Sequence, residues 1–252
     1  MTSQLRTTPK ISVQIWRPLI VRLDQKMTQA CLRRDAYLAK VLEVEIAYLD
    51  SEVGIPNSPD SFDFVTQKLD LLDRKLVSLA LPHDLTARLN DVCARKLIVR
   101  DAFFNRLYLL LAASPRVIDR LLFDGFEDDW RRLVWSENKH DGPFFQNGFY
   151  PLEPDIDPFW ALRNGLDYYS RELGLERYLE PTTGQDVMVS RGVAGELEPA
   201  PSVYSTVFNL KVSGNDLLGL SCHIPDHLIP GHPAEAAHRA GLDELFSTLE
   251  VT

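Results

Sequence analysis

The sequence predicts a mainly α-helical fold that opens with a two-stranded antiparallel β-ribbon and continues into an α+β C-terminal domain. The main observation is an internal repeat, because residues 10–42 align without a gap over residues 76–108. Seven of the 33 aligned pairs are identical, and apolar residues keep their phase in many of the others. Each copy also begins with alternating residues, and the second half of the chain differs from the first in charge and composition.

The first copy is predicted as a strand followed by two helices. Residues 10–16 alternate between apolar and polar side chains, which is the strand pattern. Pro18 favours the first turn of a helix, and apolar residues recur every four positions from Leu19. After a break near residues 29–32, a longer helix is predicted from Arg33 to about Ser51.

The second copy repeats this order after a linker. The Gly, Pro, Asn and Ser content of residues 54–61 indicates the linker, and a short helix is expected over residues 62–73. Residues 76–81 form the second predicted strand, and a four-residue apolar stripe follows from Leu85. The second long helix is predicted over residues 99–113.

The rest of the chain predicts a less regular domain. Ser114-Pro115 indicates a new helix start, and Ser213-Gly214-Asn215-Asp216 indicates the turn of a β-hairpin. We therefore expect a tandem domain over residues 1–113, with copies at about 10–52 and 75–113, and an acidic α+β domain over residues 114–252. The other expected elements are short helices at 127–135 and 158–173, an irregular loop at 141–158, a strand at 187–192, hairpin strands at 202–212 and 217–224, and a closing helix at 234–249.

Charge is divided unevenly along the chain, whose formal net charge is -9. Residues 1–112 carry 16 Lys and Arg against 13 Asp and Glu, a balance of +3, and residues 113–252 carry 11 against 23, a balance of -12. Residues 1–40 alone carry eight basic and two acidic residues. Such asymmetry indicates either a basic binding surface or an ordinary solvated one.

Other features bound the class of protein. No stretch reaches the roughly 20 apolar residues of a membrane span, and residues 1–9 lack the apolar segment of a signal peptide. Three widely spaced cysteines do not suggest a disulfide framework. A cytoplasmic location without membrane association is therefore the expectation.

The two predicted strands need each other. A single strand with two helices leaves backbone groups unpaired and an apolar face uncovered. Antiparallel pairing would turn Ile11, Val13 and Ile15, with their counterparts in the second copy, toward the helices. The other face would form a polar two-stranded ribbon, which is a shape that fits the DNA major groove.

These segments resemble the opening of ribbon-helix-helix DNA-binding proteins of the Arc/MetJ class. The resemblance rests on Ile11-Ser12-Val13-Gln14-Ile15 with Leu19 and Leu23, and on Val77-Ser78-Leu79-Ala80-Leu81 with Leu85 and Leu89. It covers about 80 residues. It implies that alternating strand residues read bases and that the start of each second helix holds a phosphate, near Leu32–Arg34 and Ile98–Arg100.

The resemblance implies unequal copies. The first presents Lys10, Ser12 and Gln14, whereas the second presents Leu76, Ser78 and Ala80, of which only the serine can hydrogen-bond through its side chain. We therefore expect the first copy to read bases and the second mainly to complete the ribbon. Arg34-Asp35 and Arg100-Asp101 could bind phosphate or could be structural. The expected DNA-binding residues are Lys10, Ser12, Gln14, Arg33, Arg34, Arg74, Lys75, Ser78 and Arg100.

The predicted function is therefore that of a sequence-specific DNA-binding transcriptional regulator, most simply a repressor. The expected partners are double-stranded DNA, further copies of the chain, and a protein or small molecule for the C-terminal domain. One alternative is an accessory protein of conjugation or mobile-element processing, similar to the TraY type. A protein-interaction scaffold of the antitoxin kind and an unrecognised enzyme in residues 114–252 are the others.

No enzymatic activity, cofactor or metal is expected. His223, His227, His232 and His238 lie near one another in the sequence, but their spacing matches no metal-site motif, so a loop is the favoured interpretation. Aromatic residues are dense between positions 144 and 169, which favours core packing or a protein interface over a small-ligand pocket.

Overall fold

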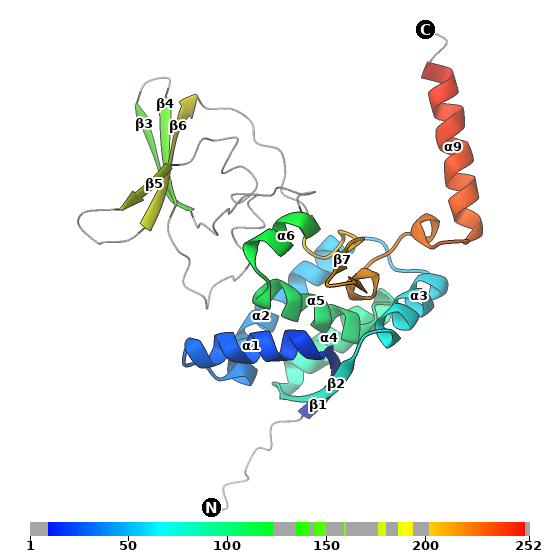
Figure 1. The fold of residues 1–252 in the computed structure, drawn as a ribbon, viewed down its shortest axis with the longest axis horizontal. Coiled ribbons are helices and arrows are strands. Elements are labelled where there is room, and N and C mark those ends of the chain that lie inside the picture. Colours follow the sequence, from blue (N-terminus) through cyan, green and yellow to red (C-terminus); the bar gives the residue numbers. More distant parts are fainter. Residues whose placement is uncertain are drawn as a thin grey trace, which may run out of the picture.

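A computed structural model of the chain describes residues 10–122, 135–141, 144–149, 159, 176–179, 186–193 and 202–249. The described part is mainly helical, and its first strand pairs with a second strand some 60 residues later in the chain. Figure 1 shows this small sheet at the lower side of the helical body, with the C-terminal helix leading away from the body at the other side.

β1 (Lys10–Trp16) and β2 (Arg74–Ala80) pair in antiparallel orientation over their whole length (Figure 1). The register places Ser12 opposite Ser78 and Val13 opposite Val77. Burial alternates along β1 from Lys10 to Ile15 and along β2 from Leu76 to Ala80, as the sequence pattern predicts. The predicted two-stranded sheet and its inward face are confirmed, and the buried members are Ile11, Val13, Ile15, Val77 and Leu79.

Each strand leads into a pair of helices. β1 is followed by α1 (Arg17–Gln29) and α2 (Arg34–Glu52), and β2 is followed by α4 (His83–Arg95) and α5 (Arg100–Ala112). α1 and α4 begin and end at positions 66 residues apart, and α2 and α5 begin 66 residues apart. The local structure therefore repeats in step with the sequence.

The turn between the two helices of each copy also repeats. Cys31 has a φ of 56° and its counterpart Leu97 has a φ of 49°, in the left-handed region that non-glycine residues rarely adopt. The next residues, Leu32 and Ile98, each donate their backbone N–H to the carbonyl five residues earlier, at 2.9 Å. Both turns thus close the preceding helix with the same hydrogen bond.

A single apolar core underlies the ribbon and the helices, and a C-terminal segment completes it. α5 is buried on all sides, since every residue from Ala102 to Ala112 is buried. Val203, Tyr204, Phe208, Leu217 and Leu220 belong to the same core. Residues 202–229 therefore pack against the helices of the repeat, although the predicted domain boundary after residue 113 stays a prediction.

Asn57 connects this C-terminal segment to the linker before α3 (Pro59–Asp70). Its side-chain amide donates to the carbonyls of Leu97 at 3.0 Å and Cys222 at 2.9 Å, and its Oδ1 accepts the N–H of Ile224 at 3.1 Å. Three backbone groups from distant parts of the chain are satisfied by one buried side chain. α3 begins three residues earlier than the predicted helix.

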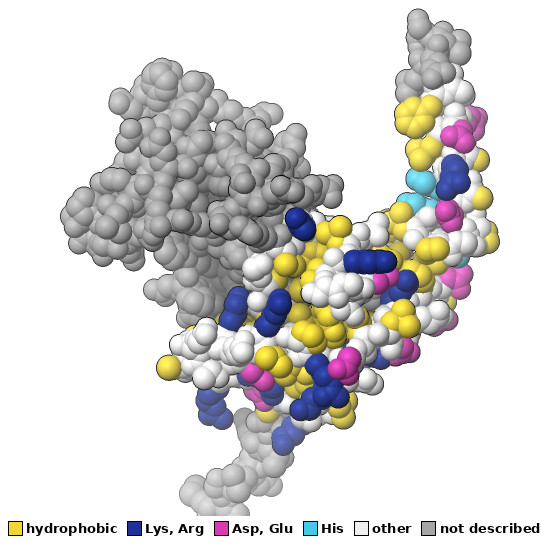
Figure 2. All heavy atoms as spheres, viewed as in Figure 1, with side chains coloured by type: hydrophobic (Ala, Val, Ile, Leu, Met, Phe, Trp, Pro, Cys, Tyr) yellow, Lys and Arg dark blue, Asp and Glu magenta, His cyan; other side chains and the backbone are white. Residues whose placement is uncertain are grey.

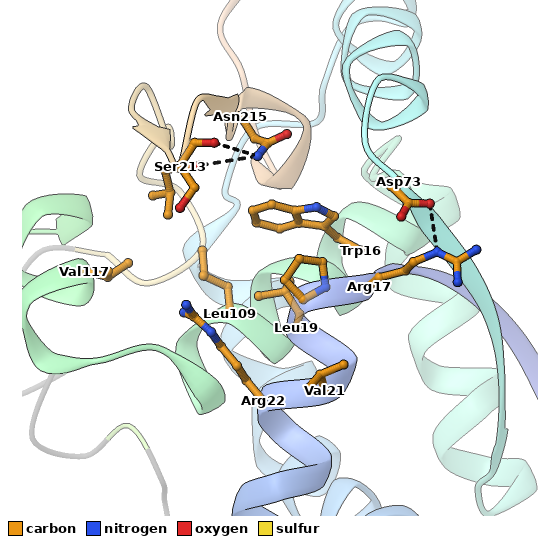
Figure 3. A pocket seen from close by; sticks show the side chains of 12 residues that line it. Trp16, Arg17, Leu19, Val21, Arg22, Asp73, Leu109, Val117, Ser213 and Asn215 are labelled. Atoms are coloured by element: carbon orange, nitrogen blue, oxygen red, sulfur yellow. Dashed lines mark hydrogen bonds and ion pairs between the residues drawn. The ribbon is translucent and has the colours of Figure 1, made fainter.

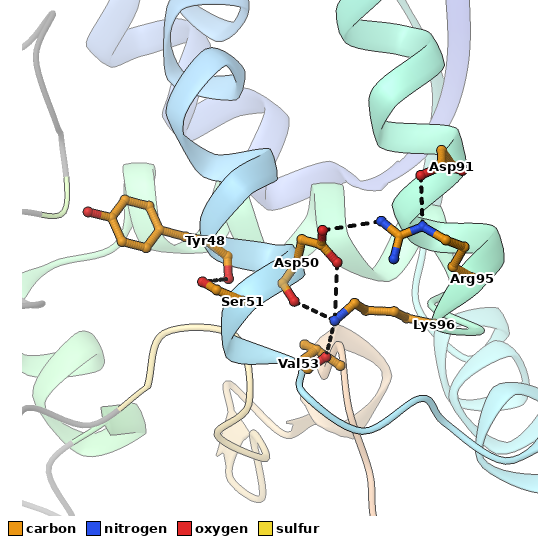
Figure 4. Close-up of polar contacts among 7 residues, drawn as sticks. All are labelled: Tyr48, Asp50, Ser51, Val53, Asp91, Arg95 and Lys96. Atoms are coloured by element: carbon orange, nitrogen blue, oxygen red, sulfur yellow. Dashed lines mark hydrogen bonds and ion pairs between the residues drawn. The ribbon is translucent and has the colours of Figure 1, made fainter.

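A polar cluster joins the end of α2 to the end of α4 (Figure 4). Lys96 Nζ donates to the backbone carbonyls of Asp50 and Val53, the latter at 2.5 Å, and thereby satisfies the C-terminus of α2. Arg95 pairs with the carboxylates of Asp50 at 3.2 Å and Asp91 at 2.8 Å. The hydrogen bond from Arg95, which has the larger effect, and the one from Lys96 both lower the pKa of the Asp50 carboxyl group.

The C-terminal half also contains a four-stranded antiparallel sheet of order β3-β4-β6-β5. The strand predicted at 187–192 is confirmed by β6. The prediction of an irregular loop at 141–158 is wrong at its start, because β4 lies there and pairs with β3 on one side and β6 on the other. Aromatic residues favour strands when such partners exist. The strands are β3 (Trp135–Asp141), β4 (Phe144–Phe149), β5 (Glu176–Leu179) and β6 (Asp186–Val193).

Two predicted helices of this half are confirmed, and the predicted hairpin is shorter than expected. α6 (Pro115–Leu122) and α9 (Pro233–Leu249) are the helices. β7 (Lys211–Val212) and β8 (Asn215–Asp216) pair around the predicted turn, but each strand has only two residues. The apolar residues that flank the hairpin are buried in the helical core instead of forming a sheet face. The short 3-10 helices η1 (Leu218–Leu220) and η2 (Asp226–Leu228) follow in the chain.

The helices predicted at 127–135 and 158–173 lie outside the described residues, apart from Trp135, which begins β3, and Phe159, which is a buried turn residue. Among the helices that the structure describes, none combines the length and the apolar character needed to span a membrane.

We predict that Gly219→Ala will destabilise the fold by about 1–3 kcal/mol, the usual cost of overpacking. A Cβ atom at Gly219 would lie 2.7 Å from the backbone nitrogen of Leu69, where η1 packs on α3. Gly54→Ala is the control, because a Cβ there meets nothing within 4 Å. Urea unfolding of both variants measures the difference, and equal stabilities would contradict the close packing of η1 on α3.

Candidate nucleic-acid interface

The outward face of the ribbon carries six side chains, most of them exposed. The facing pairs are Lys10–Ala80, Ser12–Ser78 and Gln14–Leu76. β1 thus supplies a wholly polar row, whereas β2 supplies a serine between two apolar residues, of which Leu76 is 63% exposed. Figure 2 shows Lys and Arg side chains at the lower edge of the molecule, where β1 and β2 lie in Figure 1.

Arg34 and Arg100 occupy equivalent positions at the starts of α2 and α5, and each reaches the strand of the other copy. Arg34 Nη2 donates to the carbonyl of Ser78 at 3.4 Å, and Arg100 Nη2 donates to the carbonyl of Ser12 at 3.0 Å. These carbonyls belong to the two serines that face each other at the middle of the ribbon. Both guanidinium groups therefore tie a helix start to the ribbon.

Asp35 and Asp101, the next residues of the two helices, bind the same strands. Asp35 Oδ2 accepts the N–H of Ala80 at 3.0 Å, and Asp101 accepts the N–H of Gln14. Burial raises the pKa of Asp101, and the Gln14 hydrogen bond opposes part of this shift. The sequence allows the Arg-Asp pairs either to bind phosphate or to be structural, and these contacts are structural.

Arg33 differs from its neighbour Arg34. It is the N-cap residue of α2, and its exposed side chain makes no hydrogen bond or ion pair with any described residue. The equivalent residue before α5 is Val99, and Ile98 beside it is buried. The two predicted phosphate sites are therefore unequal, and only the first has a cation available at the helix N-terminus.

Arg74 and Lys75 lie at the start of β2, opposite the last residues of β1. The guanidinium of Arg74 pairs with the carboxylate of Asp70, and its side chain is only 12% exposed. Lys75 is exposed and lies opposite Ile15. Arg74 is thus engaged within the fold, whereas Lys75 is accessible.

Asn105 positions the ribbon, and the predictions from the sequence did not include it. Asn105 is fully buried in α5, where its Oδ1 accepts the N–H of Trp16 and its Nδ2 donates to the carbonyl of Gln14, both at 2.8 Å. Nδ2 also donates to the carbonyl of Asp101 at 2.7 Å. The available signal in the sequence was an amide within a mostly apolar stretch, because buried polar groups need partners.

The C-terminal histidines have other contacts. His232 Nε2 lies 3.1 Å from Asp60 Oδ2, and the rings of His227 and His238 stack with centroids 4.1 Å apart. Within the described ranges, no three His, Cys, Asp or Glu side chains come together in a way that could hold a metal ion.

We predict that Asn105→Ala will lower the free energy of unfolding by about 1–3 kcal/mol, because it leaves buried backbone groups of β1 unpaired. Amide hydrogen exchange at Trp16 should accelerate as well. Gln25→Ala, which removes an exposed amide from α1, is the matched control and should change stability by no more than about 0.5 kcal/mol. Unchanged exchange at Trp16 in Asn105→Ala would contradict this role.

No protein-family model, curated protein or solved structure matches this chain.

Proposed function

We propose that this chain is a sequence-specific DNA-binding protein, a transcriptional regulator, in which two ribbon-helix-helix copies pair within one chain. The observation that carries the proposal is the antiparallel β1–β2 ribbon with a largely exposed outer face, on which the β1 row is wholly polar. A two-stranded ribbon of this kind fits the major groove of B-DNA, where its outward side chains reach base edges.

Reciprocal contacts support the pairing of the two copies. Ser12 and Ser78 are equivalent in the repeat and face each other, as expected at a pseudo-twofold axis. Each copy contributes one arginine to the serine carbonyl of the other, at 3.0 and 3.4 Å. A homodimer would show the same contacts twice, so one chain would here perform the work of two.

The side chains on the ribbon support a division of labour. Gln14 can bond the two major-groove atoms of adenine, and Lys10 can donate to guanine. Leu76 and Ala80 can only make apolar contact, for example with a thymine methyl group. An asymmetric ribbon implies an asymmetric half-site, in contrast to the palindromes that symmetric dimers bind.

The backbone of the DNA would be held by other residues. Arg33 is exposed and unpaired among the described residues, so it is available for a phosphate beside the N-terminus of α2. Arg34 and Arg100 already donate hydrogen bonds to the ribbon, so we assign them the role of holding the ribbon against the helices. Phosphate contacts fix register and orientation, whereas base contacts specify sequence.

Genome-fragment selection with the full chain tests the proposal. Enrichment of fragments upstream of genes that share a non-palindromic motif is the expected result. Enrichment at a transfer origin would instead favour the conjugation accessory role. No enrichment above a random library would contradict DNA binding, and the scaffold alternative would then take its place.

We predict that Gln14→Ala will cost about 1–3 kcal/mol of discrimination at one base pair, because a bidentate base contact is lost. Binding to the selected site and to each single-base variant, measured at one salt concentration, gives this value. Gln67→Ala on the exposed side of α3 is the control. An unchanged sequence preference would overturn the assignment of Gln14 as a base-reading residue.

Arg33→Gln should behave differently, because a phosphate contact carries no sequence information. We expect weaker binding to all sequences and a salt dependence reduced by about one charge equivalent. Arg239→Gln on α9 is the control, since Arg239 is also exposed but lies far from the ribbon in the chain. A loss confined to the selected site would exclude Arg33 as a phosphate contact.

A further inference from the structure

A cavity of about 510 Å³ opens where β1 passes into α1. Its walls come from α1, α5, α6 and the β7–β8 hairpin, so it joins the start of the repeat to the C-terminal segment (Figure 3). The volume lies within the usual range for small-molecule sites. The cavity lies away from the outward residues of the ribbon, none of which lines it.

The floor of the cavity is apolar and rigid. Trp16, Leu19 and Leu109 line it, and each is at least nine-tenths buried. The backbone of Trp16 is fixed by its hydrogen bond to Asn105, and Figure 3 shows its indole lying across the cavity beneath the hairpin. The accessible part of Trp16 is therefore a small edge of the indole, and aromatic rings readily meet such an edge in an edge-to-face arrangement, which favours an aromatic ligand.

Two cations line the cavity, but only one is available to a ligand. The guanidinium of Arg17 turns away to Asp73 and pairs with it at 2.8 Å (Figure 3). Arg22 has no hydrogen-bond or ion-pair partner anywhere in the described part of the chain. Figure 3 shows its side chain rising from α1 beside Leu109, on the side of the cavity where Val117 lies.

The wall formed by the hairpin is uncharged and combines Val212 with the polar residues Ser213 and Asn215. Ser213 adopts a φ of 51° in the tight turn between β7 and β8, and Asn215 Nδ2 donates to the carbonyl of Ser213 at 3.2 Å. This bond lies within the turn and leaves the Asn215 side-chain oxygen as an acceptor. With Arg17 and Asp73 neutralising each other, the lining carries one uncompensated positive charge, from Arg22.

We propose that this cavity binds a planar aromatic carboxylate. The ring would meet the accessible edge of Trp16 and contact Val117 and Val212, and the carboxylate would take a bidentate pair of hydrogen bonds from Arg22. A neutral analogue would keep the apolar contacts but lose the ion pair. This site does not depend on the proposed DNA binding.

The test uses the full chain with two probes of the same shape, 2-naphthoate and its uncharged amide, 2-naphthamide. Binding is followed by the indole N–H signal of Trp16 in ¹H–¹⁵N spectra, which Trp16→Phe identifies. We expect 2-naphthoate to shift this signal in a saturable manner. We expect 2-naphthamide to bind about tenfold more weakly, the effect of one charge-assisted contact.

Arg22→Gln should weaken 2-naphthoate about tenfold and leave 2-naphthamide unchanged. Arg88→Gln is the matched control, because Arg88 is the exposed repeat counterpart of Arg22 and does not line the cavity. Val117→Trp should abolish binding of both probes by filling the space. The proposal fails if 2-naphthoate does not bind, if both probes bind equally, or if Arg88→Gln has the effect of Arg22→Gln.

Discussion

Seven facing residue pairs join β1 to β2, and the arrangement of the helices depends on this antiparallel contact. Two strands alone are only marginally stable in water. Here one face of the pair is buried on the core, and the Arg-Asp pairs at the starts of α2 and α5 bond the backbone of the opposite strand. Each helix start thereby fixes the strand that it does not follow. A shift of register by one residue would break these bonds and turn the apolar face to solvent.

The two copies share this frame but differ in what surrounds them. Arg106 in α5 is fully buried, with its Nε 2.6 Å from the carbonyl of Val203 and its guanidinium stacked 3.6 Å from the ring of Phe208. Its counterpart Lys40 in α2 is exposed. Burial lowers the pKa of Arg106 to about 10. The C-terminal segment thus encloses Arg106 of the second copy and leaves Lys40 of the first exposed, while it also bonds Glu45 and Glu52 of α2. The strand with the wholly polar outward row belongs to the first copy.

The same asymmetry separates two surfaces. The outward face of the ribbon carries a polar row on β1 and, on β2, Ser78 between Leu76 and Ala80. Exposed Lys10 lies on this face, and exposed Arg33 lies at the start of α2. The cavity at the end of β1 is lined by Trp16 and Arg22, with walls from the C-terminal hairpin. Both meet at β1, because Gln14 lies on the outward face two residues before Trp16, and Asn105 bonds the backbone of both residues. A ligand beside Trp16 would therefore contact the strand that carries the outward side chains of Lys10, Ser12 and Gln14.

The sequence by itself determined the repeat, the alternation of β1 and β2, the starts of their helices and the outward position of Lys10, Ser12, Gln14 and Ser78. These features follow from local periodicity, which each segment carries within a few residues. The tertiary structure alone decided that Arg34 and Arg100 bond to strand carbonyls 44 and 88 residues away, and that Asn105 holds β1. It also decided that Phe208 and Leu217 pack against helices, where the sequence predicted a longer hairpin. A short apolar run or a lone polar side chain does not encode its partner, because burial and hydrogen bonding are completed by residues far away in the chain.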